Sequence, residues 1–173
     1  MIGKRNAIFK ESESVFVGIG ANLGTPREVV EIALEEVSEL AVGEVISSSI
    51  WWSEASGMAG DDFANAVVKF EFGDSPLELL DKLQALEVKH GRAADHGHHT
   101  SRTLDLDIIA FGHQLISCSR LRVPHPYACE RLFVLLPLRE IDPEFRFVNR
   151  DESLNHLIDR AERIKIALWK PEA

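Results

Sequence analysis

The sequence predicts an α+β fold, a ferredoxin-like βαββαβ sandwich in which helices pack on an antiparallel sheet, with a helical extension at the C-terminus. Strand-like and helical segments follow one another in the order of that sandwich. The chain has 173 residues, 45% of them hydrophobic, enough for one core of its own. Residues 1–13 are polar and aperiodic and are expected to be a flexible N-terminus, and residues 14–173 to be a single domain without internal repeats.

The first strand and the first helix are indicated by an apolar run and a capping signal. Val15–Ile19 is apolar throughout and is typical of a buried strand. Thr25 and Glu28 then have the spacing of a capping box, with Pro26 between them at the first helical position. This pattern predicts a helix over about 26–41.

Two strands and a second helix are expected next. Residues 44–52 are rich in β-branched and aromatic side chains, and residues 64–72 show alternation of the kind found in a sheet. A second capping signal begins at Ser75 and predicts a helix to about His90. Gly91 then stands where a helix commonly ends in a left-handed residue.

The second half of the chain contains the sixth element of the sandwich and the C-terminal extension. A polar, histidine-rich loop over 93–101 precedes the sixth element. The elements predicted after this loop are a strand over 103–111, a short return strand over 114–116, a helix around 131–139 and an amphipathic helix over 152–168.

Composition narrows the class of function. Nineteen basic against 28 acidic residues give a net charge of −9, which disfavours binding to nucleic acid or to anionic membranes. The longest apolar stretch, Leu132–Leu138, is far shorter than the ~20 residues of a membrane span. The N-terminus lacks the apolar run of a secretory signal, and Cys118 and Cys129 form no motif, so a cytoplasmic protein is expected.

Asp105 and Asp107 are the strongest candidates for chemistry. Side chains alternate along a strand, so both carboxylates project from one face with Cα atoms roughly 6.6 Å apart. Leu104, Leu106 and Ile108 then enter the core. Two carboxylates in one small site suit a pair of Mg²⁺ ions, because hard cations prefer oxygen ligands. The alternative is an ordinary polar face of an edge strand.

Basic side chains around this strand favour the metal interpretation. Arginine forks match phosphate oxygens, so aspartates facing several arginines could bracket a Mg-polyphosphate. His125 lies nearby in a rigid V-P-H-P turn. Each arginine alone would be read as a surface residue. The arginines concerned are Arg92, Arg102, Arg120, Arg122 and Arg131.

Two other patterns carry less weight. The glycines of Gly18–Gly24 do not have the spacing of a dinucleotide-binding fingerprint, and a turn whose glycines relieve backbone crowding is preferred. His96, His98 and His99 lack the second ligand pair of a zinc site. A mobile loop or a substrate lid remains open for them.

Together these motifs resemble the 6-hydroxymethyl-7,8-dihydropterin pyrophosphokinase family, whose members transfer pyrophosphate from ATP to a pterin alcohol. The resemblance covers about residues 15–147. It is carried by V-G-I-G-A-N-L-G at 17–24, Phe63-x-Asn65-Ala66, Gln84-x-x-Glu87, Gly91-Arg92, R-T-L-D-L-D at 102–107, and Val123-Pro-His125 with Arg131 and Phe133.

The resemblance implies a set of roles. It implies catalytic roles for Arg92, Arg102, Asp105 and Asp107, of which Asp105 and Asp107 hold two Mg²⁺ ions. It implies ATP contacts for Gln84, Glu87, Arg92, Arg102, Ile108, Arg120, His125 and Arg131. It implies pterin contacts for Ser53, Ala55, Gly57, Phe63, Asn65, His99, Asp105 and Phe133.

Several positions depart from the family's pattern. The loop after the second strand has Ser53, Ala55 and Gly57 where a proline-containing segment is common, and the W-G-P-R segment is replaced by H-T-S-R at 99–102. Asp95 stands where a basic residue is usual. These changes weaken an aromatic wall and part of the phosphate clamp.

The expected partners are therefore the small molecules ATP and pterin, with no nucleic acid and no membrane, and the expected state is a monomer. Two other functions stay open. One is a Mg-dependent nucleotide hydrolase or related transferase built on the same carboxylates. The other is a non-catalytic or weakly active paralogue that has kept the fold.

Overall fold

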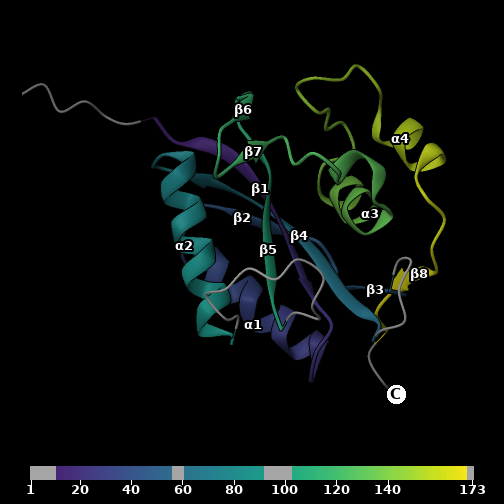
Figure 1. Cartoon of the computed structure of the whole chain (residues 1–173). Helices are drawn as coiled ribbons and strands as arrows, with labels where there is room; N and C mark the ends of the chain where they lie inside the picture. Colours follow the sequence, from purple (N-terminus) through teal and green to yellow (C-terminus); the bar gives the residue numbers. More distant parts are fainter. Residues whose placement is uncertain (1–10, 56–60, 92–102, 171–173) are drawn as a thin grey trace, which may run out of the picture.

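An antiparallel sheet of six strands forms the centre of the computed structural model, which describes residues 11–55, 61–91 and 103–170 (Figure 1). Its strands run in the order β5-β1-β4-β3-β8, with β2 also paired to β4. This is the strand order of the ferredoxin-like sandwich, and it confirms the predicted fold class. The strands are β1 (Glu13–Ala21), β2 (Val45–Ser47), β3 (Trp51–Ser53), β4 (Phe63–Phe72), β5 (Asp105–Phe111) and β8 (Ile166–Leu168).

Helices α1 (Pro26–Ser38) and α2 (Pro76–Lys89) cover one face of the sheet. The Ser75 side chain accepts a hydrogen bond from the Glu78 amide at 3.3 Å, which confirms the cap expected there. Thr25 makes no such bond, so α1 begins with its proline at the first turn but without a side-chain cap. Gly91 follows α2 at φ +92°, the left-handed conformation that favours glycine.

The C-terminal extension covers the opposite face of the sheet (Figure 1). It consists of the 3₁₀ turn η1 (Ala128–Glu130), helix α3 (Leu132–Ile141) and the short helix α4 (Leu154–Arg160). Apolar side chains from these elements pack against strand residues that point to this side, among them Phe16, Val67 and Ile109. The sheet thus has a separate apolar core on each face.

The segment 44–52, expected as one strand, is interrupted at Ser48. The Ser48 amide donates to the Val67 carbonyl at 2.8 Å, and its hydroxyl oxygen accepts from the Val67 amide at 2.9 Å. This side chain substitutes for a backbone group of the ladder, and β2 and β3 therefore pair separately with β4.

The prediction of a C-terminal helix over 152–168 is also wrong in length, because the observed helix is much shorter. Helix α4 ends at Arg160, and the backbone of the next residue, Ala161, is extended at φ −63° and ψ 152°. Beyond it, Ile164 and Ile166 pack on the second core, the one between the sheet and the C-terminal extension, and their alternate spacing is that of a strand. Strand β8 then joins the sheet beside β3. The predicted helix therefore combined helix α4 and strand β8 into one element.

The return strand expected over 114–116 does not pair with β5. The short strand β6 (Ile116–Ser117) pairs instead with β7 (Arg122–Val123), forming a separate two-stranded ribbon. Gly112 does lie in a turn, at φ +51°. None of the helices in the described part of the chain combines the length and the apolar composition that a membrane span requires.

A cluster of charged groups joins the C-terminal ends of the two helices on the first face. The Glu36 carboxylate of α1 accepts from Lys89 and lies 2.6 Å from Nε2 of His90. Burial raises the pKa of the Glu36 carboxyl, but hydrogen bonds from Lys89 and His90 outweigh it, and the pKa lies below its usual value. The cluster fixes the helix end that leads into Gly91.

Candidate active site

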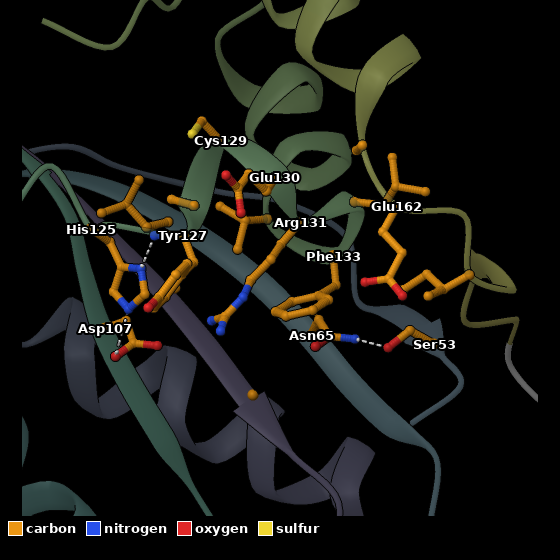
Figure 2. Close-up of a pocket in the computed structure, with 18 of the residues that line it drawn as sticks. Ser53, Asn65, Asp107, His125, Tyr127, Cys129, Glu130, Arg131, Phe133 and Glu162 are labelled. Atoms are coloured by element: carbon orange, nitrogen blue, oxygen red, sulfur yellow. Dashed lines mark hydrogen bonds and ion pairs between the residues drawn. The ribbon is translucent and has the colours of Figure 1, made fainter. Parts of the chain in front are cut away.

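A pocket of about 930 Å³ lies between the sheet and the C-terminal extension. Strands β1, β4 and β5 form its floor, and η1 and the start of α3 form its roof (Figure 2). The connection from α4 to β8 closes one end. This volume suits a ligand of nucleotide or cofactor size.

Asp105 and Asp107 lie on the floor of this pocket, as the strand period predicted. The apolar side chains Leu104, Leu106 and Ile108 are buried in the core beneath α1 and α2. The two carboxylates project from the opposite side of β5 and line the pocket together. The side chain of Ile108, expected at the nucleotide, therefore points away from the pocket.

Two glycines of β1 make room beside the carboxylates. In the strand register Gly18 lies opposite Asp107 and Gly20 opposite Asp105. A Cβ atom at Gly18 would come within 3.3 Å of Ile109 Cδ1, and one at Gly20 within 3.8 Å of Asn65 Oδ1. Gly18 lies within the strand predicted over Val15–Ile19, and Gly20 belongs to the same strand and not to the turn expected for it. Because neither glycine has a side chain, backbone atoms alone form this part of the floor.

His125 and Arg131 bring nitrogen groups to the roof above the carboxylates. His125 Nε2 lies 3.8 Å from Asp107 Oδ1, and the Tyr127 amide donates to His125 Nδ1 at 3.2 Å (Figure 2). The Arg131 guanidinium lies 5.3 Å from the centre of the Tyr127 ring and 5.6 Å from that of Phe133. Two aromatic rings thus position one guanidinium over the pocket.

The environment of His125 favours the neutral imidazole. Burial, reinforced by the charge of Arg131, lowers the pKa of His125 from its usual value, and the nearby Asp105 opposes this only in part. Since Nδ1 accepts the Tyr127 amide hydrogen, the neutral ring carries its proton on Nε2. His125 therefore presents an N–H donor to the side where Asp107 lies.

At the other end of the pocket, a buried amide is held by two hydrogen bonds. Asn65 Nδ2 donates to Ser53 Oγ at 2.9 Å and to the Trp51 carbonyl at 3.3 Å. Both Asn65 and Ser53 are almost fully buried. Phe133 lies at this end in Figure 2, and Phe63, which is opposite Ser53 in the strand register, also lines the pocket. An aromatic face beside an oriented amide is suited to a flat heterocycle.

Three residues expected at the nucleotide are placed on the α2 side of the molecule and do not line the pocket. Glu87 is buried, and its carboxylate accepts the Leu106 amide at 2.8 Å, between the two aspartates in sequence. Arg120 donates to Asp81 and, at 3.5 Å, to Gln84. The structure therefore places Glu87 as a support for β5.

The remaining expected residues divide into described and undescribed ones. Ala55 is half-buried just after β3. Four of them lie outside the described residues, namely Gly57, Arg92, His99 and Arg102. The same holds for Asp95, for the histidine loop, and for most of the N-terminal segment 1–13.

The pocket also contains residues that the sequence reasoning missed. No role is predicted from the sequence for Tyr127 in the roof, nor for Arg160 and Glu162, which fall within the helix expected over 152–168. Their contribution depends on packing of the extension across the sheet, for which the sequence carries no local signal. Glycines at alternate strand positions, Gly18 and Gly20, were a usable signal.

Comparisons with known proteins point in one direction. A family model described as 7,8-dihydro-6-hydroxymethylpterin-pyrophosphokinase matches residues 16–143. A Pseudomonas aeruginosa protein is 40% identical over 136 residues, which are 78% of this chain and 83% of that one. A Haemophilus influenzae protein is 39% identical over 130 residues, 74% of this chain and 81% of that one. Both are named 2-amino-4-hydroxy-6-hydroxymethyldihydropteridine pyrophosphokinase.

Solved structures agree in fold. The Plasmodium falciparum HPPK-DHPS wild type with pteroate superposes with a TM-score of 0.68 at 12% identity. The match covers 86% of this chain and 42% of that one, so this chain spans less than half the length of that protein.

Proposed function

The chain belongs to the 7,8-dihydro-6-hydroxymethylpterin-pyrophosphokinase family, and from this premise we propose how its pocket performs the reaction. It is an ATP-dependent pyrophosphokinase of folate biosynthesis that acts on hydroxymethyldihydropterin. The assignment of residues to steps is our proposal. The observation that supports it is that one pocket contains three kinds of group. These are two carboxylates, two hydrogen-bond donors in the roof, and, at one end, aromatic rings beside an amide.

The pterin ring binds at the end lined by Phe63, Phe133 and Asn65. Phe133 supplies an aromatic face, and Asn65 an amide oxygen in a fixed orientation. In the strand register Asn65 lies opposite Gly20, and Gly20 opposite Asp105. The hydroxymethyl group of a ring at this end is thereby directed along the floor toward the carboxylates.

The pterin hydroxyl oxygen attacks the β-phosphorus of ATP in line. A new oxygen–phosphorus bond forms, the bond from the β-phosphorus to the α,β-bridging oxygen breaks, and AMP leaves. The hydroxyl proton passes to Asp105, the floor carboxylate in the same row as Asn65. Positioning and neutralisation of charge supply most of the rate enhancement in such transfers.

The donor set fits Mg²⁺. Among the described residues, no group of three or more histidine, cysteine or acidic side chains is arranged to hold a metal. Asp105 and Asp107 are two hard oxygen ligands on one strand face. Mg²⁺ commonly takes one or two protein carboxylates and completes its shell with phosphate and water. Bound Mg²⁺ would neutralise phosphate charge and orient the transferred group.

The roof holds the phosphates from the opposite side. The Nε2–H of His125 and the Arg131 guanidinium donate to phosphate oxygens, with Arg131 oriented by its two aromatic neighbours. Arg92 and Arg102 complete the clamp on the basis of the family resemblance. The nucleotide thus lies between the carboxylate floor and the hydrogen-bond donors of the roof.

The test is a product assay with Mg·ATP and 6-hydroxymethyl-7,8-dihydropterin, separated by HPLC. We expect AMP and pterin diphosphate in equal amounts, and no turnover in EDTA. Release of ADP and phosphate, or of pyrophosphate without pterin product, would instead indicate a nucleotide hydrolase. Pterin binding without consumption of ATP would indicate a paralogue that has lost catalysis.

We further propose that the enzyme acts as a cytoplasmic monomer on these two small molecules. Its acidic charge supports this, because a net charge of −9 opposes recruitment to nucleic acid or anionic membranes. Light scattering after size exclusion should give about the mass of one chain, 19.4 kDa. A mass of two chains would contradict the monomer.

A further inference from the structure

The connection between α4 and β8 forms a wall of the pocket, and it is anchored on both sides. Ala161 is buried at the end of α4, and Ile164 packs on the second core. The Glu54 amide donates to the Lys165 carbonyl at 3.0 Å, while the Lys165 amide donates to the Glu54 carboxylate at 2.8 Å. The short segment that contains Glu162 is therefore fixed beside the end of β3.

The Glu162 carboxylate is directed into the pocket. Figure 2 shows it turned toward the end where Phe133, Asn65 and Ser53 lie, and Glu162 lines the pocket with them. Among the described residues it forms no hydrogen bond and no ion pair. The nearby Arg160, which also lines the pocket, pairs with Glu152 at 3.1 Å.

Apart from Arg160, which is paired with Glu152, the polar groups at this end of the pocket are mainly acceptors. Both hydrogens of Asn65 Nδ2 are used within the protein, by Ser53 Oγ and by the Trp51 carbonyl, so Asn65 offers a ligand only its Oδ1 atom. Glu162 adds two carboxylate oxygens. Ser53, whose oxygen already accepts from Asn65, can contribute a single donor.

From this inventory we propose that Glu162 is a specificity-determining residue that accepts hydrogen bonds from the amino-bearing edge of the pterin. The inference rests on the proposed function of the pocket. A pterin carries its 2-amino group next to N3–H, and the dihydro form adds N8–H, so one edge of the ring is rich in donors. A carboxylate is the group that pairs most strongly with adjacent N–H donors.

The same charge excludes the other substrate from this end. A polyphosphate would meet repulsion from Glu162, whereas above the carboxylate floor the Arg131 guanidinium attracts it and the neutral His125 donates a hydrogen bond to it. Glu162 therefore contributes both to recognition of the pterin edge and to the direction in which the two substrates enter the pocket.

The experiment is calorimetric titration of 6-hydroxymethyl-7,8-dihydropterin into wild type, Glu162→Gln and Glu35→Gln. Glu35 is an exposed glutamate on α1, on the far side of the sheet, and matches the change in charge. We expect a roughly tenfold rise in Kd for pterin with Glu162→Gln, the loss of one charge-assisted interaction. Glu35→Gln should bind pterin like wild type, and Kd for ATP should not rise in either variant.

A second titration uses the analogue with a carbonyl oxygen in place of the 2-amino group. Wild type should bind it much more weakly than the pterin, and Glu162→Gln should narrow that difference. Equal pterin affinity in wild type and Glu162→Gln, with the wild type binding tightly, would overturn the role of Glu162 alone. Failure of the wild type to bind pterin would overturn the proposed function, and this inference with it.

Discussion

Removal of the Ser53 hydroxyl tests how the pocket fixes its buried amide. Ser53→Ala deletes the acceptor 2.9 Å from Asn65 Nδ2 and leaves the second bond, to the Trp51 carbonyl, in place. Ser53 is 1% exposed and Asn65 3% exposed, so water has little access to the orphaned N–H. An unsatisfied buried donor costs about 1–3 kcal/mol.

A value of about 2 kcal/mol corresponds to a fall in Tm of roughly 4–8 °C for a domain of this size. The pterin should also bind several-fold more weakly, because the amide retains only one anchor, while ATP affinity stays unchanged. Differential scanning calorimetry measures the first effect and titration with pterin the second. Ser47→Ala, at an exposed serine of β2, is the matched control and should melt like wild type.

A double-mutant cycle isolates the hydrogen bond. In an Asn65→Ala background, Ser53→Ala should cost little, since no donor remains to be orphaned. If Ser53→Ala melts within about 1 °C of wild type and binds pterin equally well, the amide does not depend on Ser53. The conclusion that both Nδ2 hydrogens of Asn65 are used within the protein would then be wrong.

Three further predictions concern other parts of the molecule. Asp107→Ala should abolish Mg-dependent turnover while leaving Tm within a few degrees, because the side chain is 41% exposed, and an active variant would contradict the metal assignment. Tyr127→Ala should weaken ATP binding about two- to fivefold by removing an exposed cation–π contact, and Tyr127→Phe should not. Glu36→Gln should lose about 1 kcal/mol at pH 7 in denaturant unfolding. Since the pKa of Glu36 is lowered in the folded state, this loss should shrink as the pH falls below about 4.5, and a difference independent of pH would count against the Lys89–His90 cluster.

The long strands of the sheet and its first two helices could be predicted because their signals are local, whereas the break between β2 and β3 and the strand β8 were missed. A strand with a period of two places Asp105 and Asp107 on one face wherever the strand lies in the fold, and capping residues mark the helix starts in the sequence. The motifs of the family then brought Asn65, His125 and Phe133 to the same pocket, where the structure places them.

The contributions of the extension could not be predicted in this way. Glu162 reaches the pocket because Ala161 ends a helix and Lys165 bonds to Glu54, more than 100 positions earlier in the chain. Glu87 carried a motif signal for nucleotide contact, yet its burial beneath β5 depends on how α2 packs. Such long-range contacts have no signature in a local window of sequence.

The backbone floor at Gly18 and Gly20 has a consequence for how the pocket can adapt. A side chain can change rotamer to admit a larger ligand, but β1 is hydrogen-bonded to β4 and β5 on both sides and cannot move aside alone. Variation in ligand shape must therefore be accommodated by the roof and the end wall. An inhibitor that contacts the backbone at Gly18 and Gly20 would therefore be difficult to evade by mutation. Any side chain introduced at these positions would occupy part of the pocket and weaken binding of the substrates as well.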